Sequence, residues 1–246
     1  MKNTFTAFCL SLCLLGWLNC TAQNTGNASH DYYQISIYHT ANQAQFDSLN
    51  RYLQTSYVPQ LHKGGRSRVG VFFPIANDTS ADKRVVVWMP LVNLEQITKI
   101  NYSPEAPKYA RLETILLSAF VKAPKYQMPH LSGPAAQHVF ELRSYESPTE
   151  ERYLSKEKMF NLGNEVDLFA RLKFNGVFYA RVLAGSRMPN LMYMTSFDNQ
   201  QTHDEHWKAF NEDAEWKKLS GMAEYQKNVN KADIILMHPA AYSDVL

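Results

Sequence analysis

Two stretches of this chain repeat the same order of strand and helix patterns, and this repeat limits the fold more than any other feature. The first stretch predicts, in order, a strand over 33–38, a helix over 41–62, strands over 69–73 and 84–89, and a short helix over 93–100. The second predicts a strand over 140–145, a helix over 156–174, strands over 177–183 and 191–197, a helix from Asn199 and a strand over 232–237. The spacing agrees as well, because 31 residues separate Tyr38 from Val69 and 32 separate Tyr145 from Val177.

Each stretch therefore predicts a β-α-β-β-α-β unit of the ferredoxin-like kind, with its helices on one face of a four-stranded antiparallel sheet. The other face of the sheet needs a cover, and two units in one chain can cover each other. We predict an α+β protein in which two tandem ferredoxin-like units, over 32–123 and 138–246, pack sheet to sheet as a pseudo-dimer. The linker 122–137, which contains several prolines and Gly133, separates them.

One segment of the first half departs from the repeat. Its apolar residues recur at helical spacing, at Tyr109, Leu112, Ile115, Leu116 and Phe120. We expect an additional amphipathic helix over 104–120, packed beside the first unit and leading towards the linker.

The first 23 residues have the composition of a secretory signal peptide. Lys2 gives a positive start, a short apolar run extends from Phe5 to Leu18, and small residues precede a cleavage site near Gln23. The run is shorter than the roughly 20 apolar residues of a spanning helix, so no transmembrane segment is expected. We predict an exported protein, periplasmic or extracellular. Lipidation at Cys20 is the less favoured alternative, because Trp17-Leu18-Asn19 is a poor recognition sequence for it.

Composition excludes several kinds of function for the mature chain. All three cysteines, Cys9, Cys13 and Cys20, fall in the leader, which leaves no thiol for a disulfide, a nucleophile or a thiolate metal site after cleavage. Loss of Lys2 lowers the net charge from +2 to +1. The sequence contains no stripe of basic residues with interleaved aromatics, so nucleic-acid binding is not expected. Gly64-Gly65 follows a predicted helix and lacks a phosphate-loop pattern, so nucleotide binding is not supported. No cofactor is expected.

Four segments of the second half, 140–147, 184–194, 206–210 and 213–219, together resemble the NIPSNAP family. Segments 69–72 and 111–120 of the first half resemble, less specifically, the N-terminal domain of its secreted two-domain members. Ala214 departs from the proline usual at that position. The resemblance implies the dimeric α+β barrel version of the ferredoxin-like fold and no settled biochemical activity. Barrels of this kind include cofactor-free monooxygenases, haem-degrading enzymes and small-ligand binders, an analogy of fold only.

The sequence offers a small set of polar candidates for a ligand pocket. Glu141, Arg143 and Tyr145 share one side of a strand, because side chains alternate along it. If Phe140 and Leu142 face the helices, this trio faces the space between the sheets, with Tyr193 from a neighbouring strand beside it. The plainer interpretation, a buried ion pair between Glu141 and Arg143, is favoured over a ligand site.

The helix after Asn199 contributes two further candidates, His206 and Trp207. His203 and His206 share a helix face, but no third ligand stands at a metal-binding spacing, so no metal site is predicted. Trp207 is more typical of a core aromatic residue than of a cofactor cage.

Three hypotheses for the function follow. The first is an exported protein that binds a small hydrophobic or aromatic ligand, or a protein partner, in a pocket between the sheets or at the helix–sheet seam. The second is a cofactor-independent monooxygenase-like enzyme that uses Tyr145, His206 and Trp207. The third is a structural module that forms homo-oligomers through its sheet edges. A cavity of roughly 300 Å³ or more favours the first two, and a filled interior favours the third.

Overall fold

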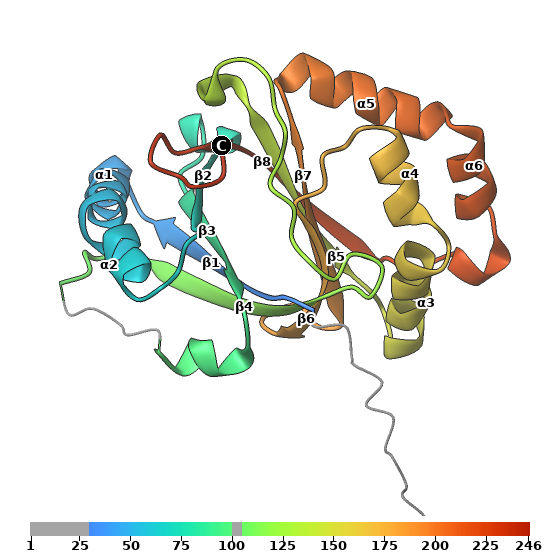
Figure 1. Cartoon of the computed structure of the whole chain (residues 1–246), viewed down its shortest axis with the longest axis horizontal. Coiled ribbons are helices and arrows are strands. Elements are labelled where there is room, and N and C mark those ends of the chain that lie inside the picture. The colour runs from blue at the N-terminus through green and yellow to red at the C-terminus, as the bar shows by residue number, and fades with distance from the viewer. Residues whose placement is uncertain (1–29, 100–104) are drawn as a thin grey trace, which may run out of the picture.

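The computed structural model describes residues 30–99 and 105–246, which form an eight-stranded barrel with helices on two opposite sides (Figure 1). The predicted α+β class is confirmed. The predicted leader lies outside the described residues. Among the helices described, none combines the length and the apolar character needed to cross a bilayer.

The strands form a single closed sheet in the order β1-β3-β2-β8-β5-β7-β6-β4, and each neighbouring pair is antiparallel. The strands are β1 (Tyr32–Thr40), β2 (Gly70–Pro74), β3 (Lys83–Leu91), β4 (Arg111–Ala119), β5 (Val139–Glu146), β6 (Phe178–Ala184), β7 (Asn190–Phe197) and β8 (Lys231–Pro239). Each half of the chain contributes four adjacent strands, in the order fourth, first, third, second. The halves join where β2 pairs with β8 and where β4 pairs with β6. The limits 32–123 and 138–246 stay a prediction, because both halves share one sheet.

The helices of the first half follow β1 as one nearly continuous rod. The Asn42 side chain accepts a hydrogen bond from the Gln45 backbone N–H and so caps α1 (Gln43–Tyr52). A π-helical turn over Leu53–Tyr57 leads into α2 (Val58–Lys63), which ends at Gly64. The predicted helix over 41–62 is therefore confirmed. Short 3₁₀ turns lie at Ile75–Asp78, Leu94–Lys99, Ala135–Gln137 and Ala223–Tyr225.

The second half has a more extensive helical layer. The predicted helix over 156–174 is two helices, α3 (Glu150–Asn161) and α4 (Glu165–Arg171), because the chain turns at Asn164, whose φ of 64° is left-handed. The helix expected from Asn199 is α5 (Gln200–Glu212), capped by the Asn199 side chain. Asp213 caps the next helix, α6 (Ala214–Ser220).

The extra amphipathic helix predicted over 104–120 is wrong. Over the described part of that segment, residues 111–119 form β4, which pairs with β1 along its length and then with β6. Ile115 and Leu117 point into the barrel, whereas Leu112 packs against the outer layer of the first half. A strand with apolar residues on both faces has no clean alternation, and its pattern can resemble that of a helix.

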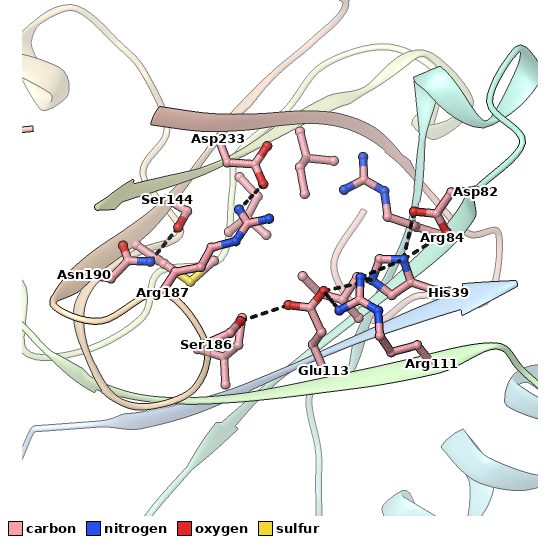
Figure 2. A pocket seen from close by; sticks show the side chains of 15 residues that line it. His39, Asp82, Arg84, Arg111, Glu113, Ser144, Ser186, Arg187, Asn190 and Asp233 are labelled. Carbon is pink, nitrogen blue, oxygen red and sulfur yellow. Dashed lines mark hydrogen bonds and ion pairs between the residues drawn. The ribbon is translucent and has the colours of Figure 1, made fainter. Parts of the chain in front are cut away.

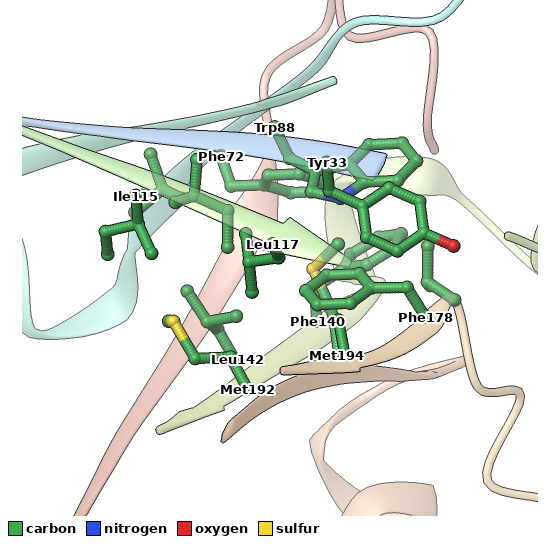
Figure 3. Packing of buried hydrophobic residues seen from close by; sticks show 14 of the residues in the cluster. Tyr33, Phe72, Trp88, Ile115, Leu117, Phe140, Leu142, Phe178, Met192 and Met194 are labelled. Atoms are coloured by element: carbon green, nitrogen blue, oxygen red, sulfur yellow. The ribbon is translucent and has the colours of Figure 1, made fainter. Parts of the chain in front are cut away.

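The barrel interior is filled mainly with large apolar side chains (Figure 3). Tyr33, Trp88 and Phe178 pack together, with ring centroids 5.0–5.9 Å apart. Phe140 and Leu142 also belong to this interior cluster, so the sequence-based assumption that they face the helices is wrong. Because side chains alternate along β5, Glu141, Arg143 and Tyr145 face the helices instead. The apolar face of this strand thus joins the barrel core, and its polar face meets the helix layer.

The linker between the halves covers one end of the barrel. Tyr126, Met128 and Leu131 pack against the interior cluster, and the Gln127 backbone N–H donates to the Val177 carbonyl at 2.9 Å. The Tyr126 ring meets Trp88 edge-on with centroids 5.6 Å apart. Strand β1 runs away from this end, from Tyr33 to His39, so His39 lies at the opposite end of the barrel.

Candidate functional site

The end of the barrel opposite the linker holds a cavity of about 150 Å³ (Figure 2). Its floor is apolar, and its rim carries charged and hydroxyl side chains from both halves of the chain. The floor residues are Ile37, Ile115, Leu142, Met192 and Ile235, and the rim residues are His39, Asp82, Arg84, Arg111, Glu113, Ser144, Ser186, Arg187, Asn190 and Asp233. We call this cavity the barrel mouth. Mouths of β-barrels are common positions for small-molecule sites.

The first half contributes a histidine held between two carboxylates. His39 Nδ1 lies 2.9 Å from the Asp82 carboxylate, and its Nε2 lies 2.9 Å from Glu113 Oε1. The Arg111 guanidinium donates to Glu113 at 2.5 Å and lies 2.9 Å from His39 Nε2. Both ring nitrogens are thus engaged, which fixes the His39 imidazole in place.

Glu113 has polar contacts with three side chains of the rim. Burial favours its neutral form, but hydrogen bonds from His39, Arg111 and Ser186 favour the carboxylate and together lower its pKa below the ordinary value. The Ser186 hydroxyl donates to Glu113 Oε2 at 3.1 Å and comes from the second half of the chain. Glu113 therefore carries a negative charge that its neighbours already balance.

The second half contributes its own paired groups. Arg187 donates to Asp233 at 2.6 Å, and this carboxylate raises the Arg187 pKa. On the same side, Asn190 Nδ2 donates to the Ser144 hydroxyl at 2.7 Å. These contacts fix the positions of the rim side chains before any ligand arrives.

Arg84 differs from the other two arginines of the rim. It comes from β3, directly opposite His39 of β1 in the sheet, and its side chain is half-buried. Figure 2 shows its guanidinium pointing across the mouth. Within the described residues, this guanidinium has no hydrogen-bond or ion-pair partner, whereas Arg111 and Arg187 each pair with a carboxylate. The rim therefore presents one arginine that can receive an anion.

Two larger hollows lie on the outer surface, and neither presents such a group. One, of about 610 Å³, contains Arg181, which is bound to both oxygens of Glu157 at 2.6 Å. The other, of about 300 Å³, contains Lys83, which donates to the Asn77 carbonyl at 2.5 Å. Their cations are already committed to protein acceptors.

Five of the six residues predicted as a pocket from the sequence do meet, at the seam between the sheet and α5. Arg143 Nε donates to Glu141 Oε1 at 2.7 Å, and Arg143 Nη1 donates to the Tyr145 hydroxyl at 2.9 Å. The Tyr145 and Tyr193 hydroxyls are 2.9 Å apart. Trp207 Nε1 donates to Glu141 Oε2 at 2.5 Å, and the Arg143 guanidinium lies 3.7 Å from a Trp207 ring centroid. We call these five residues the seam network.

Charge in the seam network is balanced internally. Glu141 is only 1% exposed. Burial opposes its ionisation, but a hydrogen bond from His203 and the charge of Arg143 outweigh burial and lower the Glu141 pKa. His203 Nε2 lies 3.4 Å from Glu141 Oε2. His206 stands apart from the network, with its ring 5.8–6.0 Å from those of Phe197 and Phe174. No group of three or more metal-ligating side chains suited to a metal ion occurs among the described residues.

The barrel mouth was not predicted from the sequence. His39, Arg84, Glu113 and Asp233 are polar residues near the ends of different strands, and such residues are ordinarily solvated. The available signal was the strand pattern itself: once β4 is recognised, Arg111 and Glu113 fall on the same face as Ile115. The incorrect helix over 104–120 concealed that alignment.

Residues 140–244 match the NIPSNAP family model, as the sequence resemblance predicted. No curated protein matches the chain.

Solved structures with a similar fold include three that extend over both halves of the chain. A proposed monooxygenase of Lactobacillus acidophilus NCFM is 11% identical, with a TM-score of 0.56 over 85% of this chain and 94% of its own. A proposed monooxygenase of Fusobacterium nucleatum is 6% identical, with a TM-score of 0.57 over 86% and 93%. An anthrone oxidase-like protein is 8% identical, with a TM-score of 0.54 over 87% and 92%. These likenesses show a shared α+β fold and leave the activity open.

Proposed function

We propose that this chain, whose second half matches the NIPSNAP family model, is an exported binding protein that holds a small ligand in the barrel mouth. One observation carries the proposal. Among the described residues the Arg84 guanidinium has no partner, and it lies above an apolar floor. The cavity of about 150 Å³ is smaller than the roughly 300 Å³ expected for a ligand pocket between the sheets, but a cavity of about this volume can hold a molecule the size of benzene.

The proposal includes a fused pseudo-dimer. Both halves repeat the strand order fourth, first, third, second, and each supplies residues to the rim and the floor of the mouth. In such an arrangement neither half has a complete site alone.

Catalysis is the alternative, and fold similarity to monooxygenase-like proteins is its support. The residues assigned to that role do not meet at one open site, because Tyr145 and Trp207 belong to the seam network and His206 lies among aromatic rings. In the mouth, His39 has both nitrogens engaged. These contacts favour binding over catalysis. The third hypothesis, oligomerisation through sheet edges, fits a closed barrel less well because closure removes the edges.

If the mouth holds a ligand, substitutions at two adjacent residues of β8 should have different effects on ligand binding. Ile235 lines the floor, whereas the adjacent Ile234 points outward and is 46% exposed. In native mass spectrometry of the chain purified from its source envelope, we expect a small-molecule adduct on the unaltered protein. Ile235→Phe should abolish the adduct by filling the floor, and Ile234→Phe should retain it. An adduct that persists in Ile235→Phe, or its absence from the unaltered protein, contradicts the proposal.

Export predicts the mass of the mature chain. Cleavage near Gln23 should remove about 22 residues, and because every cysteine lies before that point, the mature protein should not react with thiol reagents. Intact-mass measurement of protein from the source envelope checks both expectations. A mass that corresponds to a diacylated Cys20 would replace soluble export with membrane anchoring.

A further inference from the structure

We propose that the ligand of the barrel mouth is a small monoanionic organic acid, with its carboxylate on Arg84 and its apolar body on the floor. The inference rests on the proposed function and adds the chemical class of the ligand. It comes from the charges around the rim, the depth at which they lie and the size of the cavity.

The rim charges are matched except at Arg84. Three arginines and three carboxylates surround the opening, and His39 lies between two of the carboxylates. Arg111 pairs with Glu113, and Arg187 pairs with Asp233. Arg84 lacks such a pair within the described residues. A planar guanidinium can bind a carboxylate through two parallel hydrogen bonds, so a carboxylate suits this position.

The nearby carboxylates limit the charge of the ligand. Asp82, Glu113 and Asp233 all line the same cavity, and each would repel a second negative charge on the ligand. One available arginine can balance one charge. A carboxylate is therefore favoured over a phosphate monoester, which is largely dianionic near neutral pH.

The floor requires an apolar body on the same molecule. Leu142, Met192 and Ile235 from the second half and Ile37 and Ile115 from the first half are all buried. They lie below the charged rim, so a ligand that extends from Arg84 to the floor must be polar at one end only. The volume of about 150 Å³ limits its body to roughly a benzene ring.

The two halves of the chain contribute different parts of the ligand site. Arg84, His39 and Glu113 all lie outside residues 140–244, the segment that matches the family model. The matched segment supplies much of the apolar floor, and the first half supplies the anion-binding arginine. The acid specificity is therefore a property of the first half.

Three probes of similar size test the charge requirement: benzoate, benzyl alcohol and phenyl phosphate. Their binding to the mature full-length chain is measured by isothermal titration calorimetry, or by NMR titration if the affinity is low. We expect benzoate to bind more tightly than both benzyl alcohol and phenyl phosphate. Arg84→Gln should weaken benzoate binding about tenfold or more, since a hydrogen-bonded charged partner is lost. The same variant should leave benzyl alcohol binding within about twofold, because that probe makes no ionic contact.

Two further variants separate a local effect from a general one. Arg84→Lys keeps the charge without the planar fork and should recover part of the benzoate affinity. Arg51→Gln, at an exposed arginine on α1, should bind all three probes as the unaltered chain does. A thermal melt of each variant checks that it is folded.

The outcomes distinguish this inference from the proposed function. Benzoate binding that is equal in Arg84→Gln and the unaltered chain overturns the assignment of Arg84. Binding of benzyl alcohol as tightly as benzoate, or of phenyl phosphate more tightly, overturns the acid class while the mouth stays a binding site. If none of the three probes binds, the acid class and the mouth as a site for ligands of this size both fail.

Discussion

Arg143→Met is expected to lower the free energy of unfolding by about 3–5 kcal/mol, because it leaves the Glu141 carboxylate buried without its ionic partner. Glu141 is 1% exposed, and Arg143 donates to it at 2.7 Å. The loss includes the contact of the guanidinium with the Trp207 ring. Chemical denaturation monitored by circular dichroism measures the change.

A double variant shows whether the unpaired charge is responsible. Glu141→Gln combined with Arg143→Met removes both charges and keeps an amide oxygen to accept the hydrogen bond from Trp207 Nε1. It should recover much of the stability lost in the single variant. Arg171→Met is the matched control, since Arg171 forms exposed ion pairs with Asp213 and Glu215, and its loss should change the free energy of unfolding far less than Arg143→Met does.

The same comparison can revive the ligand interpretation of the seam network. If Arg143→Met leaves the melting temperature almost unchanged, Arg143 does not act as a structural partner. A simultaneous loss of a ligand-induced rise in melting temperature would then make the seam network a binding site. A large loss with little recovery in the double variant would contradict both interpretations.

Local spacing was enough to predict much of this fold. The alternation over 140–145 identified β5, and Asn199 before a helical pattern located the start of α5. The repeated strand and helix order indicated two similar units. It did not indicate that β2 would pair with β8, because that contact joins residues far apart in the chain and only three residue pairs form it.

Burial of both faces of strands β4 and β5 explains why the sequence did not predict their structure or orientation correctly. Strand β5 carries Phe140 and Leu142 on one face and Glu141, Arg143 and Tyr145 on the other, and both faces are covered. Alternation identifies the two faces without saying which one points into the barrel. The same double coverage made β4 resemble a helix.

The seam network and the barrel mouth differ in how far apart their residues lie in the sequence. Glu141, Arg143 and Tyr145 of the seam network stand at every second residue of one strand, so their association could be predicted from spacing alone. The barrel mouth draws its rim from strand ends and loops between His39 and Asp233. Its charged groups come together only when the barrel closes. No short spacing in the sequence predicts this association.

An isolated fragment of residues 138–246 is expected to dimerise or aggregate where the full-length chain does not. In the full chain, β8 pairs with β2 and β6 pairs with β4, so the fragment would have two unpaired strand edges. It would also expose Phe140, Leu142 and Met194, which face the other half of the barrel. An exposed apolar face of this size, flanked by open edges, promotes association between copies.

Size-exclusion chromatography with light scattering can compare the fragment with the full-length mature chain at the same molar concentration. A second fragment with Met237→Asp, which places a charge on the inner face, should associate less as a dimer and melt at a lower temperature. A monomeric 138–246 fragment with the full stability of the intact chain would mean that the second half covers its own inner face. The shared barrel would then contribute nothing to stability, and the mouth, whose arginine lies in the first half, would have to form by docking of two independently stable domains.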